Sequence, residues 1–403
     1  MRSIQSIATR CVTLLLFILA ACSGGPAEPE VQSCTPSDDQ DPCTHDTCAD
    51  GITTHTAVIG DPSWYQCSTD ITFFAMGDPQ YGGGADNKNS FHLAALNQFA
   101  GTLWRDELPS AGTPVAQPLG LLIAGDLTQN GKDGRDEALG PGRNEIGEFE
   151  TDYGLTGTEG LLNMPVYEGY GNHDFDPDMP DDEFNWRYYY DENPTPSVER
   201  VVARNANRVG LLNTATGNGG HYSWDWGNVH FVNVNLFAGD EPSQIDETSV
   251  TRDPRMSLSF LRDDLRLHVG DSNRPVIIMQ HYGFDQFGYE ERWWTDAHKD
   301  DFLEVIRPYN IVLLLHGHTH ATYRYEWEGY DALNVGSPYY ESYNFDGRGH
   351  FTVFRITDTT LEVSDATWNP TEQGANPQFS GWYLSKSLQP ACLPDGLPAC
   401  MAD

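Results

Sequence analysis

Five short apolar segments, each followed at once by polar residues, constrain the fold of this chain more than any other feature. The segments cover residues 71–77, 119–125, 164–171, 274–283 and 311–320. Each has the length and composition of a buried strand. Residues 91–104, 257–268 and 300–310 have the apolar spacing of helices. Helices that alternate with buried strands predict an α/β fold.

A hairpin and a run of short strands complete the predicted pattern. Residues 221–237 have the pattern of a β-hairpin, two strands joined by a turn at Trp226-Gly227-Asn228. Further strands are predicted at 321–327, 330–336, 350–356 and 360–366. These last strands predict an antiparallel continuation of the fold. His221, His230 and His316 lie in the strands, and we interpret them as structural residues.

The polar residues that follow the five buried segments are potential metal ligands. They are Asp78-Pro79-Gln80, Gly125-Asp126, Gly171-Asn172-His173-Asp174, Gln280-His281 and Gly317-His318-Thr319-His320. Ligands of α/β proteins gather beyond the carboxyl ends of strands, so these groups can converge on one site. Carboxylate, carboxamide and imidazole together suit divalent Mn, Fe, Zn or Mg.

The same residues carry a resemblance to a known family. Asp-x-Gln at 78–80, GDxxxxG at 125–131, GNHD at 171–174, His281 after its strand and GHTH at 317–320 stand in order. As a set they resemble the motifs of the calcineurin-like metallophosphoesterases. The resemblance implies a four-layer α/β/β/α sandwich of two mixed β-sheets flanked by helices, here over residues 71–369. It also implies two divalent metal ions and hydrolysis of a phosphate ester.

The resemblance assigns a role to each motif residue. It implies Asp78, Gln80 and His320 as ligands of one metal, Asn172, His281 and His318 as ligands of the other, and Asp126 as the bridge. His173 is implied as the catalytic acid or as a group that stabilises charge, with a metal-bridging hydroxide as nucleophile. A phosphomonoester is the favoured substrate. The alternatives are a diesterase for nucleotides or phospholipid headgroups, and a non-catalytic surface binding protein on a degenerate fold.

The chain departs from the family pattern at three places. Gln80 stands where histidine is frequent, which predicts weaker binding or a harder ion at that metal. Gln129 and Asn130 replace the acid and arginine of the phosphoprotein-phosphatase branch, so the chain is not expected to be a close relative of it. Asp174 could orient His173 or cap its loop.

Residues 1–22 predict an export signal with a lipid anchor. Arg2 and Arg10 precede the apolar stretch Val12 to Ala21, which is too short to cross a bilayer. Leu19-Ala20-Ala21-Cys22 resembles the bacterial lipobox, in which the cysteine is lipidated. We expect an extracytoplasmic protein attached to the bacterial (outer) membrane through Cys22. Ordinary secretion is the alternative.

The remaining cysteines fit an oxidising compartment. Cys34, Cys43, Cys48, Cys67, Cys392 and Cys400 are even in number and lie at the two ends of the chain. Cys392 and Cys400 are expected to pair within a tail at 370–403. The first four lie in a flexible tether and Cys-rich module at 23–70, with three possible connectivities. A zinc site is disfavoured because the close two-residue spacing is missing.

Charge limits the partners. A formal net charge of -36 disfavours nucleic acid, whose phosphates it would repel. We interpret the acidity as a solvated surface. The expected substrate is a small-molecule or lipid phosphate ester. The aromatic segments 183–194, 284–294 and 337–345 either line the substrate cleft or pack on its rim.

Overall fold

The structure is a computed structural model, and it describes thirteen stretches of the chain. They are residues 44–49, 52–57, 69–82, 88–129, 131, 144–175, 196–208, 210–217, 219–242, 253–284, 294–338, 348–369 and 377–388. The signal segment with Cys22, the predicted Cys392–Cys400 pair, and Cys34, Cys43 and Cys67 lie outside these stretches. Most of the three aromatic segments also lies outside them. Among the described helices, none has the length and apolar character needed to span a bilayer.

Three parallel strands form the half of the six-stranded sheet that supplies the first three motifs. The sheet has the order β15 (Gln378–Ser387), β14 (Thr360–Trp368), β13 (Gly349–Thr357), β3 (Asp70–Met76), β4 (Leu121–Ile123) and β5 (Val166–Glu168). β3, β4 and β5 are parallel, whereas β13, β14 and β15 continue the sheet antiparallel. The carboxyl ends of β3, β4 and β5 therefore share one edge.

The seven-stranded sheet supplies the last two motifs. Its order is β11 (Tyr323–Trp327), β12 (Tyr330–Asn334), β10 (Ile311–His316), β9 (Val276–Met279), β8 (Val229–Asn233), β7 (Tyr222–Trp226) and β6 (Thr214–Ala215). β8, β9 and β10 run parallel to one another. The predicted hairpin is present, since β7 and β8 pair antiparallel across the expected turn.

Successive side chains of a strand point to opposite faces of its sheet, and this alternation explains how the sheets and helices form layers. Phe73 of β3 packs on Phe231 of the other sheet, with ring centroids 5.2 Å apart. The next residue, Phe74, points to the opposite face and meets Phe99 of a helix at 5.9 Å. Both faces of β3 are thus buried, as its continuous apolar sequence predicts.

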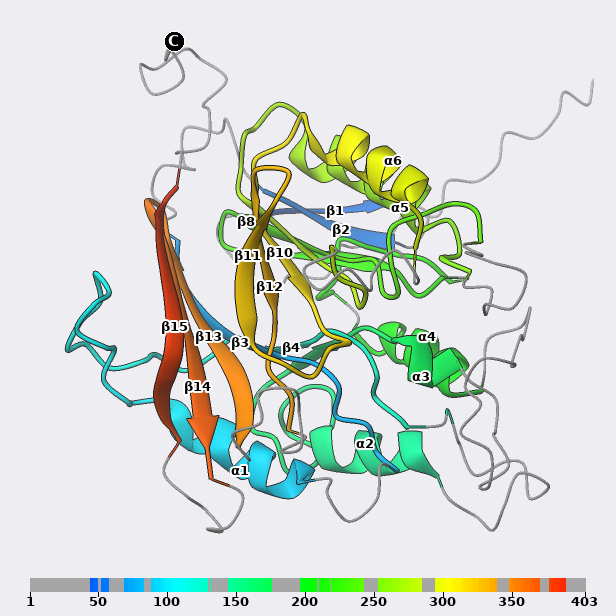
Figure 1. Ribbon diagram of the computed structural model, residues 1–403. Helices are drawn as coiled ribbons and strands as arrows, with labels where there is room; N and C mark the ends of the chain where they lie inside the picture. The colour runs from blue at the N-terminus through cyan, green and yellow to red at the C-terminus, as the bar shows by residue number, and fades with distance from the viewer. Residues whose placement is uncertain are drawn as a thin grey trace, which may run out of the picture.

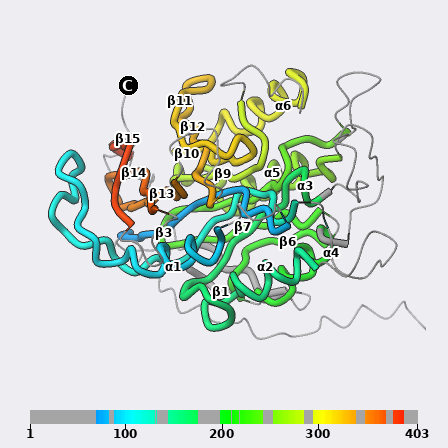
Figure 2. Tube along the Cα trace, turned by 60° about the horizontal axis from the view of Figure 1, so that its bottom comes forward, coloured from blue at the N-terminus to red at the C-terminus, as the bar shows by residue number. Residues whose placement is uncertain are grey.

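Helices cover the outer faces of both sheets (Figure 1). α1 (Asn89–Phe99) and α2 (Glu145–Tyr153) lie against the six-stranded sheet, and α5 (Ser257–Asp264) and α6 (Asp296–Ile306) against the seven-stranded one. A π-helical turn, Leu265–Val269, continues α5. The predicted architecture of two mixed sheets flanked by helices is therefore confirmed. The loop between α1 and β4 projects from the side of the molecule (cyan in Figure 2).

The helix α2 is one of several elements that the sequence pattern did not predict. α2 buries Ile146, Phe149 and Tyr153 on one face, although its sequence contains a glycine and five acidic or polar residues. Asn144 starts this helix by accepting a hydrogen bond from the backbone N–H of Gly147 at 3.0 Å. Without an apolar excess, the helical period of α2 is hard to see in the sequence.

The structured part of the chain extends past both predicted ends of the main domain. β15 pairs with β14 beyond residue 369, the predicted boundary of the tail. The register shifts between Ser364 and Ala366, and Gly381 on β15 has a positive φ of 56°, so the strand period is interrupted there. In the Cys-rich module, β1 (Thr44–Ala49) and β2 (Ile52–Ala57) form an antiparallel hairpin. α3 (Asn172–Phe175) and α4 (Pro196–Asn205) complete the described helices.

Candidate metal centre

All predicted site residues of the phosphoesterase domain lie just beyond strand ends. Asp78 and Gln80 follow β3, Asp126 follows β4, and Asn172 and His173 begin α3 after β5. His281 follows β9, and His318 and His320 follow β10. The two sheets face each other, so these two sets of loops meet above the same edge of the sandwich.

Five of these residues form two groups that could each hold a metal ion. Asp78, Asp126 and His320 place one ligand atom each within 4.8 Å of one another, and so do Asp126, His281 and His318. Asp126 belongs to both groups. A carboxylate shared by two ligand sets is the arrangement that a two-metal centre needs.

Asn172 and Gln80 lie at this centre as well. The side-chain Oδ1 of Asn172 is 3.0 Å from His281 Nε2, which places it beside the second group. Gln80 is buried in the loop of Asp78, and its backbone N–H donates to the carbonyl oxygen of Asp126 at 2.9 Å. His173 lies at the partly exposed side of the centre, with the 19% exposed side chain of His320.

Hydrogen bonds between the loops hold the ligands together. The backbone N–H of Asp78 donates to Gly125 O at 3.0 Å, and the N–H of His318 donates to the Asp78 carboxylate at 3.0 and 3.1 Å. The N–H of His173 donates to Asp126 Oδ1 at 2.9 Å. Each contact joins two segments that are distant in sequence, so backbone N–H groups and the carboxylates of the ligands together hold the centre.

Many ligand residues have a backbone conformation that L-amino acids seldom adopt. Positive φ angles of 39° to 74° occur at Asp78, Gln80, Asp126, His318 and His320. A non-glycine residue in this region costs about 1–3 kcal/mol, and such residues cluster at functional sites. These conformations turn the chain sharply after β3, β4 and β10, which helps to bring the side chains together.

The residues present fit divalent cations. Asp126 Oδ2 is buried and has no hydrogen-bond partner in the described part of the chain. His281 Nδ1 lies 2.7 Å from the carbonyl oxygen of Ala124 and must donate to it. In the neutral ring, Nε2 then presents a lone pair toward Asn172 Oδ1 and toward Asp126 Oδ2, 3.2 Å away. A cation among these three atoms would relieve their repulsion.

Burial and neighbouring charges shift the pKa values of these groups in the directions that a metal centre requires. Burial raises the pKa of Asp78 well above its usual value, and the charge of Asp126 adds to the increase. Burial alone would lower the pKa of His281, but the charges of Asp126 and Asp78 outweigh it and raise that pKa to about 9. Burial lowers the pKa of His320 to about 4. In the absence of a metal ion, a proton on His281 Nε2 is therefore favoured beside Asp126, at the position that a bound cation would take, while His320 stays neutral and able to bind a metal.

His173 is oriented by a backbone carbonyl. Its Nδ1 lies 2.8 Å from the oxygen of Gln129, so Nδ1 carries the proton and donates it. The Asp174 carboxylate instead accepts hydrogen bonds from the backbone N–H groups of Gly171 at 2.8 Å, Leu127 at 3.1 Å and Thr128 at 2.9 Å. Of the two roles considered for Asp174, these contacts are those of a loop cap.

Gly171 permits the loops to approach one another. A Cβ atom at this position would overlap Asp126 Oδ1 and would lie 2.7 Å from both Asp126 N and His281 Cε1. Any side chain at position 171 would therefore displace the shared carboxylate. The GNHD motif therefore requires glycine at position 171, because there is no room for a Cβ atom.

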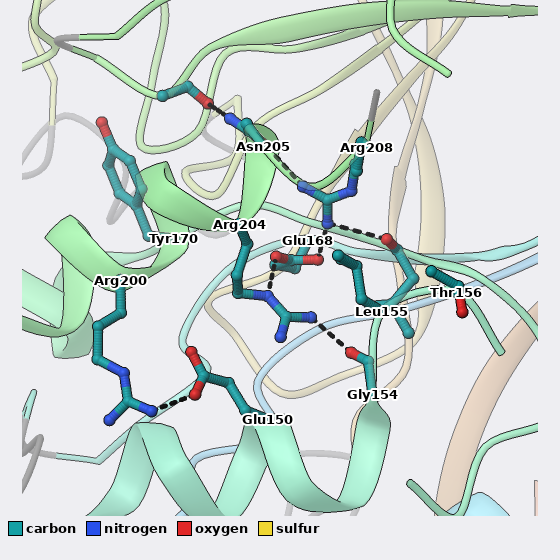
Figure 3. A network of polar contacts seen from close by, with 12 residues as sticks. Glu150, Gly154, Leu155, Thr156, Glu168, Tyr170, Arg200, Arg204, Asn205 and Arg208 are labelled. Carbon is teal, nitrogen blue, oxygen red and sulfur yellow. Dashed lines mark hydrogen bonds and ion pairs between the residues drawn. The ribbon is translucent and has the colours of Figure 1, made fainter. Parts of the chain in front are cut away.

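A buried ion cluster supports the strand that leads into this loop (Figure 3). Glu168, the last residue of β5, has no exposed surface and pairs with Arg204 at 2.6 Å and with Arg208. Arg204 also donates to Gly154 O at 2.5 Å, and Arg208 to Val166 O at 2.9 Å. Through Arg204 and Arg208, the cluster holds α4 and the segment that follows it against β5. Nothing in the sequence pattern indicated this pairing, because arginines on a short polar helix are usually solvated.

This fold, two mixed sheets flanked by helices, and this pair of ligand groups are those of a metal-dependent hydrolase. The family model for calcineurin-like phosphoesterases matches residues 57–322. The chain belongs to this family, as the motifs predicted, and it is a metal-dependent phosphoesterase enzyme. The family uses divalent metal ions, and the acidic and imidazole side chains described above are suited to hold them.

Comparison with solved structures gives distant likenesses of fold. GAP50, the anchor in the inner membrane complex of Plasmodium, is 11% identical with a TM-score of 0.45, over 79% of this chain and 89% of that one. Purple acid phosphatase PPD1 from yellow lupin (Lupinus luteus) seeds is 12% identical with a TM-score of 0.47, over 83% and 56%. A dimetal phosphatase from Danio rerio is 13% identical with a TM-score of 0.44, over 77% and 98%. A search of curated proteins gave no match.

Proposed function

We propose that this protein is an exported phosphoesterase that hydrolyses a phosphate ester, with phosphomonoesters favoured, at a centre of two divalent metal ions. The observation that carries the proposal is the position of Asp126 in both ligand groups. Asp78, Gln80 and His320 would hold one ion with Asp126, and Asn172, His281 and His318 the other. When bound, the two ions would supply an activated water as nucleophile and neutralise charge on the phosphate.

The residues of the chain prepare this chemistry in three ways. Buried Asp78 and Asp126 provide negative charge where cations are required. His281 is held in one orientation by the Ala124 carbonyl. His173 donates from Nδ1 to Gln129, so in the doubly protonated ring the proton on Nε2 is the one that could pass to a leaving oxygen.

A comparison of two chromogenic esters tests the function. Purified protein is stripped with chelator, reloaded with Mn²⁺, Fe²⁺, Zn²⁺ or Mg²⁺, and assayed with p-nitrophenyl phosphate and with bis-p-nitrophenyl phosphate. We expect metal-dependent turnover with a preference for the monoester. A preference for the diester would replace the monoesterase by a diesterase. Full metal occupancy with no turnover of either ester would instead indicate a binding protein.

The cellular location is a separate proposal that depends on sequence alone. We propose that Cys22 carries a lipid and holds the enzyme on the membrane, where small-molecule and lipid phosphate esters are both within reach. Detergent phase partitioning of wild type and Cys22→Ala, expressed in a bacterial host, tests the anchor. The wild type should enter the detergent phase and the variant should not. Equal partitioning of both into the aqueous phase would contradict the anchor while leaving the enzyme assignment intact.

A further inference from the structure

Asn235 lies two residues beyond β8, at the same edge of the sheets as the metal centre. It is 1% exposed, and its φ of 60° is in the left-handed region. Asparagine tolerates this conformation better than most residues, because its short side chain can form local hydrogen bonds. No motif includes this residue, and no sequence pattern assigns it to the site.

Asn235 contacts two segments that carry ligands of the same proposed metal. Its carbonyl oxygen accepts a hydrogen bond from the backbone N–H of His281 at 2.6 Å. Its side-chain Oδ1 accepts one from the backbone N–H of Tyr170 at 3.3 Å. Tyr170 precedes Gly171 and Asn172, so this contact holds the start of the GNHD loop.

The amide of Asn235 is itself fixed by neighbours. Nδ2 donates to Gly219 O at 3.2 Å and to His221 Nδ1 at 3.0 Å. The backbone N–H of Asn235 donates to Asn233 Oδ1 at 2.9 Å, and Asn233 Nδ2 donates to the carbonyl oxygen of Glu168 at 3.2 Å. The hydrogen bonds of Asn233 and Asn235 therefore connect β8, the end of β5 and His281.

We infer that Asn235 is a positioning residue that sets the distance between His281 and Asn172. The inference rests on the proposed function, in which these two residues and His318 bind one ion together with Asp126. Asn235 is not one of the proposed ligands. It holds the backbone of one ligand with its main chain and the loop of the other with its side chain, so removal of the amide weakens the hold on the loop of Asn172. Groups of this kind behind metal ligands typically change metal affinity about 10–100-fold.

Two variants separate positioning from general stability. Asn235→Gly removes the side chain and keeps the left-handed backbone without strain. Asn235→Asp keeps the shape and one acceptor oxygen for Tyr170 N, but loses the donors to Gly219 and His221. Ser257→Ala is the control, because Ser257 Oγ is also buried and bonded to the backbone of the same segment, at Phe237 O (2.7 Å) and Gly239 N (2.9 Å), without contact to a ligand.

The measurement is metal binding by the apoprotein, followed by the visible absorption of Co²⁺ during titration. We expect wild type and Ser257→Ala to bind two equivalents. Asn235→Gly should bind one equivalent normally and the other about 10–100-fold more weakly, and Asn235→Asp should show a smaller loss at the same site. Circular dichroism establishes that each variant is folded, and Asn235→Asp decides the question if Asn235→Gly is unfolded.

The possible results distinguish this inference from the function beneath it. Unchanged binding of both equivalents by the folded variants would overturn the positioning role and leave the phosphoesterase intact. Equal weakening at both sites, or the same weakening in Ser257→Ala, would also overturn it, since the effect would then be one of general stability. A wild-type protein that binds fewer than two equivalents would contradict the proposed two-metal function itself.

Discussion

The Nδ1 atom of His173 lies 2.8 Å from the carbonyl oxygen of Gln129, so a main-chain atom orients the ring that faces the centre. His173→Gln should lower turnover about 100–10,000-fold, the usual contribution of a general acid, because glutamine cannot pass a proton. Metal content, measured by mass spectrometry of the purified protein, should stay near that of wild type. Loss of metal would show that His173 is a ligand.

The matched control is a substitution at Gln129, the residue whose backbone oxygen accepts the hydrogen bond from His173. Gln129→Ala removes the side chain and leaves the carbonyl, so we expect the turnover of this variant to stay within about threefold of wild type, as for a substitution worth under about 0.6 kcal/mol. A large loss in Gln129→Ala would mean that the amide side chain, and not the carbonyl, serves the reaction.

Asp126→Asn tests the shared ligand. The substitution keeps the shape and removes the negative charge that both ligand groups share. Removal of several kcal/mol of metal-derived charge stabilisation should lower kcat by more than about a thousandfold. Equilibrium dialysis should show fewer than two bound metal equivalents. A variant with near-normal turnover would contradict the dinuclear assignment.

Gly171→Ala tests the close approach of the loops. The added methyl group would overlap Asp126 Oδ1, and overpacking of this kind destabilises a protein by about 1–3 kcal/mol. We expect reduced metal affinity in dialysis and a lower midpoint in urea unfolding. Gly217→Ala is the control, since no atom lies within 4 Å of the Cβ added there. Equal behaviour of the two variants would show that the site adapts without loss.

A fourth prediction concerns pH and lies away from the metal centre. His230 places Nδ1 2.7 Å from Asp225 and Nε2 2.7 Å from Asp264, so both ring nitrogens donate to carboxylates. Burial would lower the pKa of His230, but Asp264 and Asp225 outweigh burial and raise it. Arg274 also faces Asp225, at 3.0 Å. The charged ring is therefore favoured in the folded state.

The sign of the pH effect follows from the raised pKa. The stabilisation is fully present below the unfolded pKa of about 6.5 and is lost as pH rises through the higher folded value. The free energy of unfolding should fall by at most about 1.4 kcal/mol per pH unit in this window, and His230→Gln should lack this component. Urea unfolding of both proteins with chelator, from pH 6 to 9, measures the difference. Parallel pH curves would contradict a charged His230.

The elements nearest the centre could be predicted because their sequences are simple. β3 and β10 are short, continuously apolar and buried on both faces, so their ends could be placed from sequence. The polar residues that follow them stand out against this background. Ligands of α/β proteins gather beyond the carboxyl ends of strands, so Asp78 and His318 could be expected to meet although β3 and β10 lie in different sheets. The structure brings them within hydrogen-bonding distance.

The remaining features of the site depend on backbone atoms, backbone angles and tertiary contacts, which cannot be read from residue types. Any amino acid at position 129 would offer the same carbonyl to His173. The positive φ of Asp126 comes from the turn after β4, which the motif alone does not reveal. Asn235 and the Glu168–Arg204 pair act through neighbours that are distant in sequence. A helix such as α2 has few apolar residues and is stabilised mainly by tertiary contacts. Its sequence therefore shows only a weak helical spacing of apolar residues.

The left-handed turns at five proposed ligands have a consequence for how the enzyme acquires its ions. The loops that contain them are joined to one another by main-chain hydrogen bonds, such as Asp78 N to Gly125 O at 3.0 Å and Gln80 N to Asp126 O at 2.9 Å. These main-chain hydrogen bonds hold the loops in shape whichever divalent ion is bound. We expect a preorganised centre that can exchange one kind of divalent ion for another without unfolding.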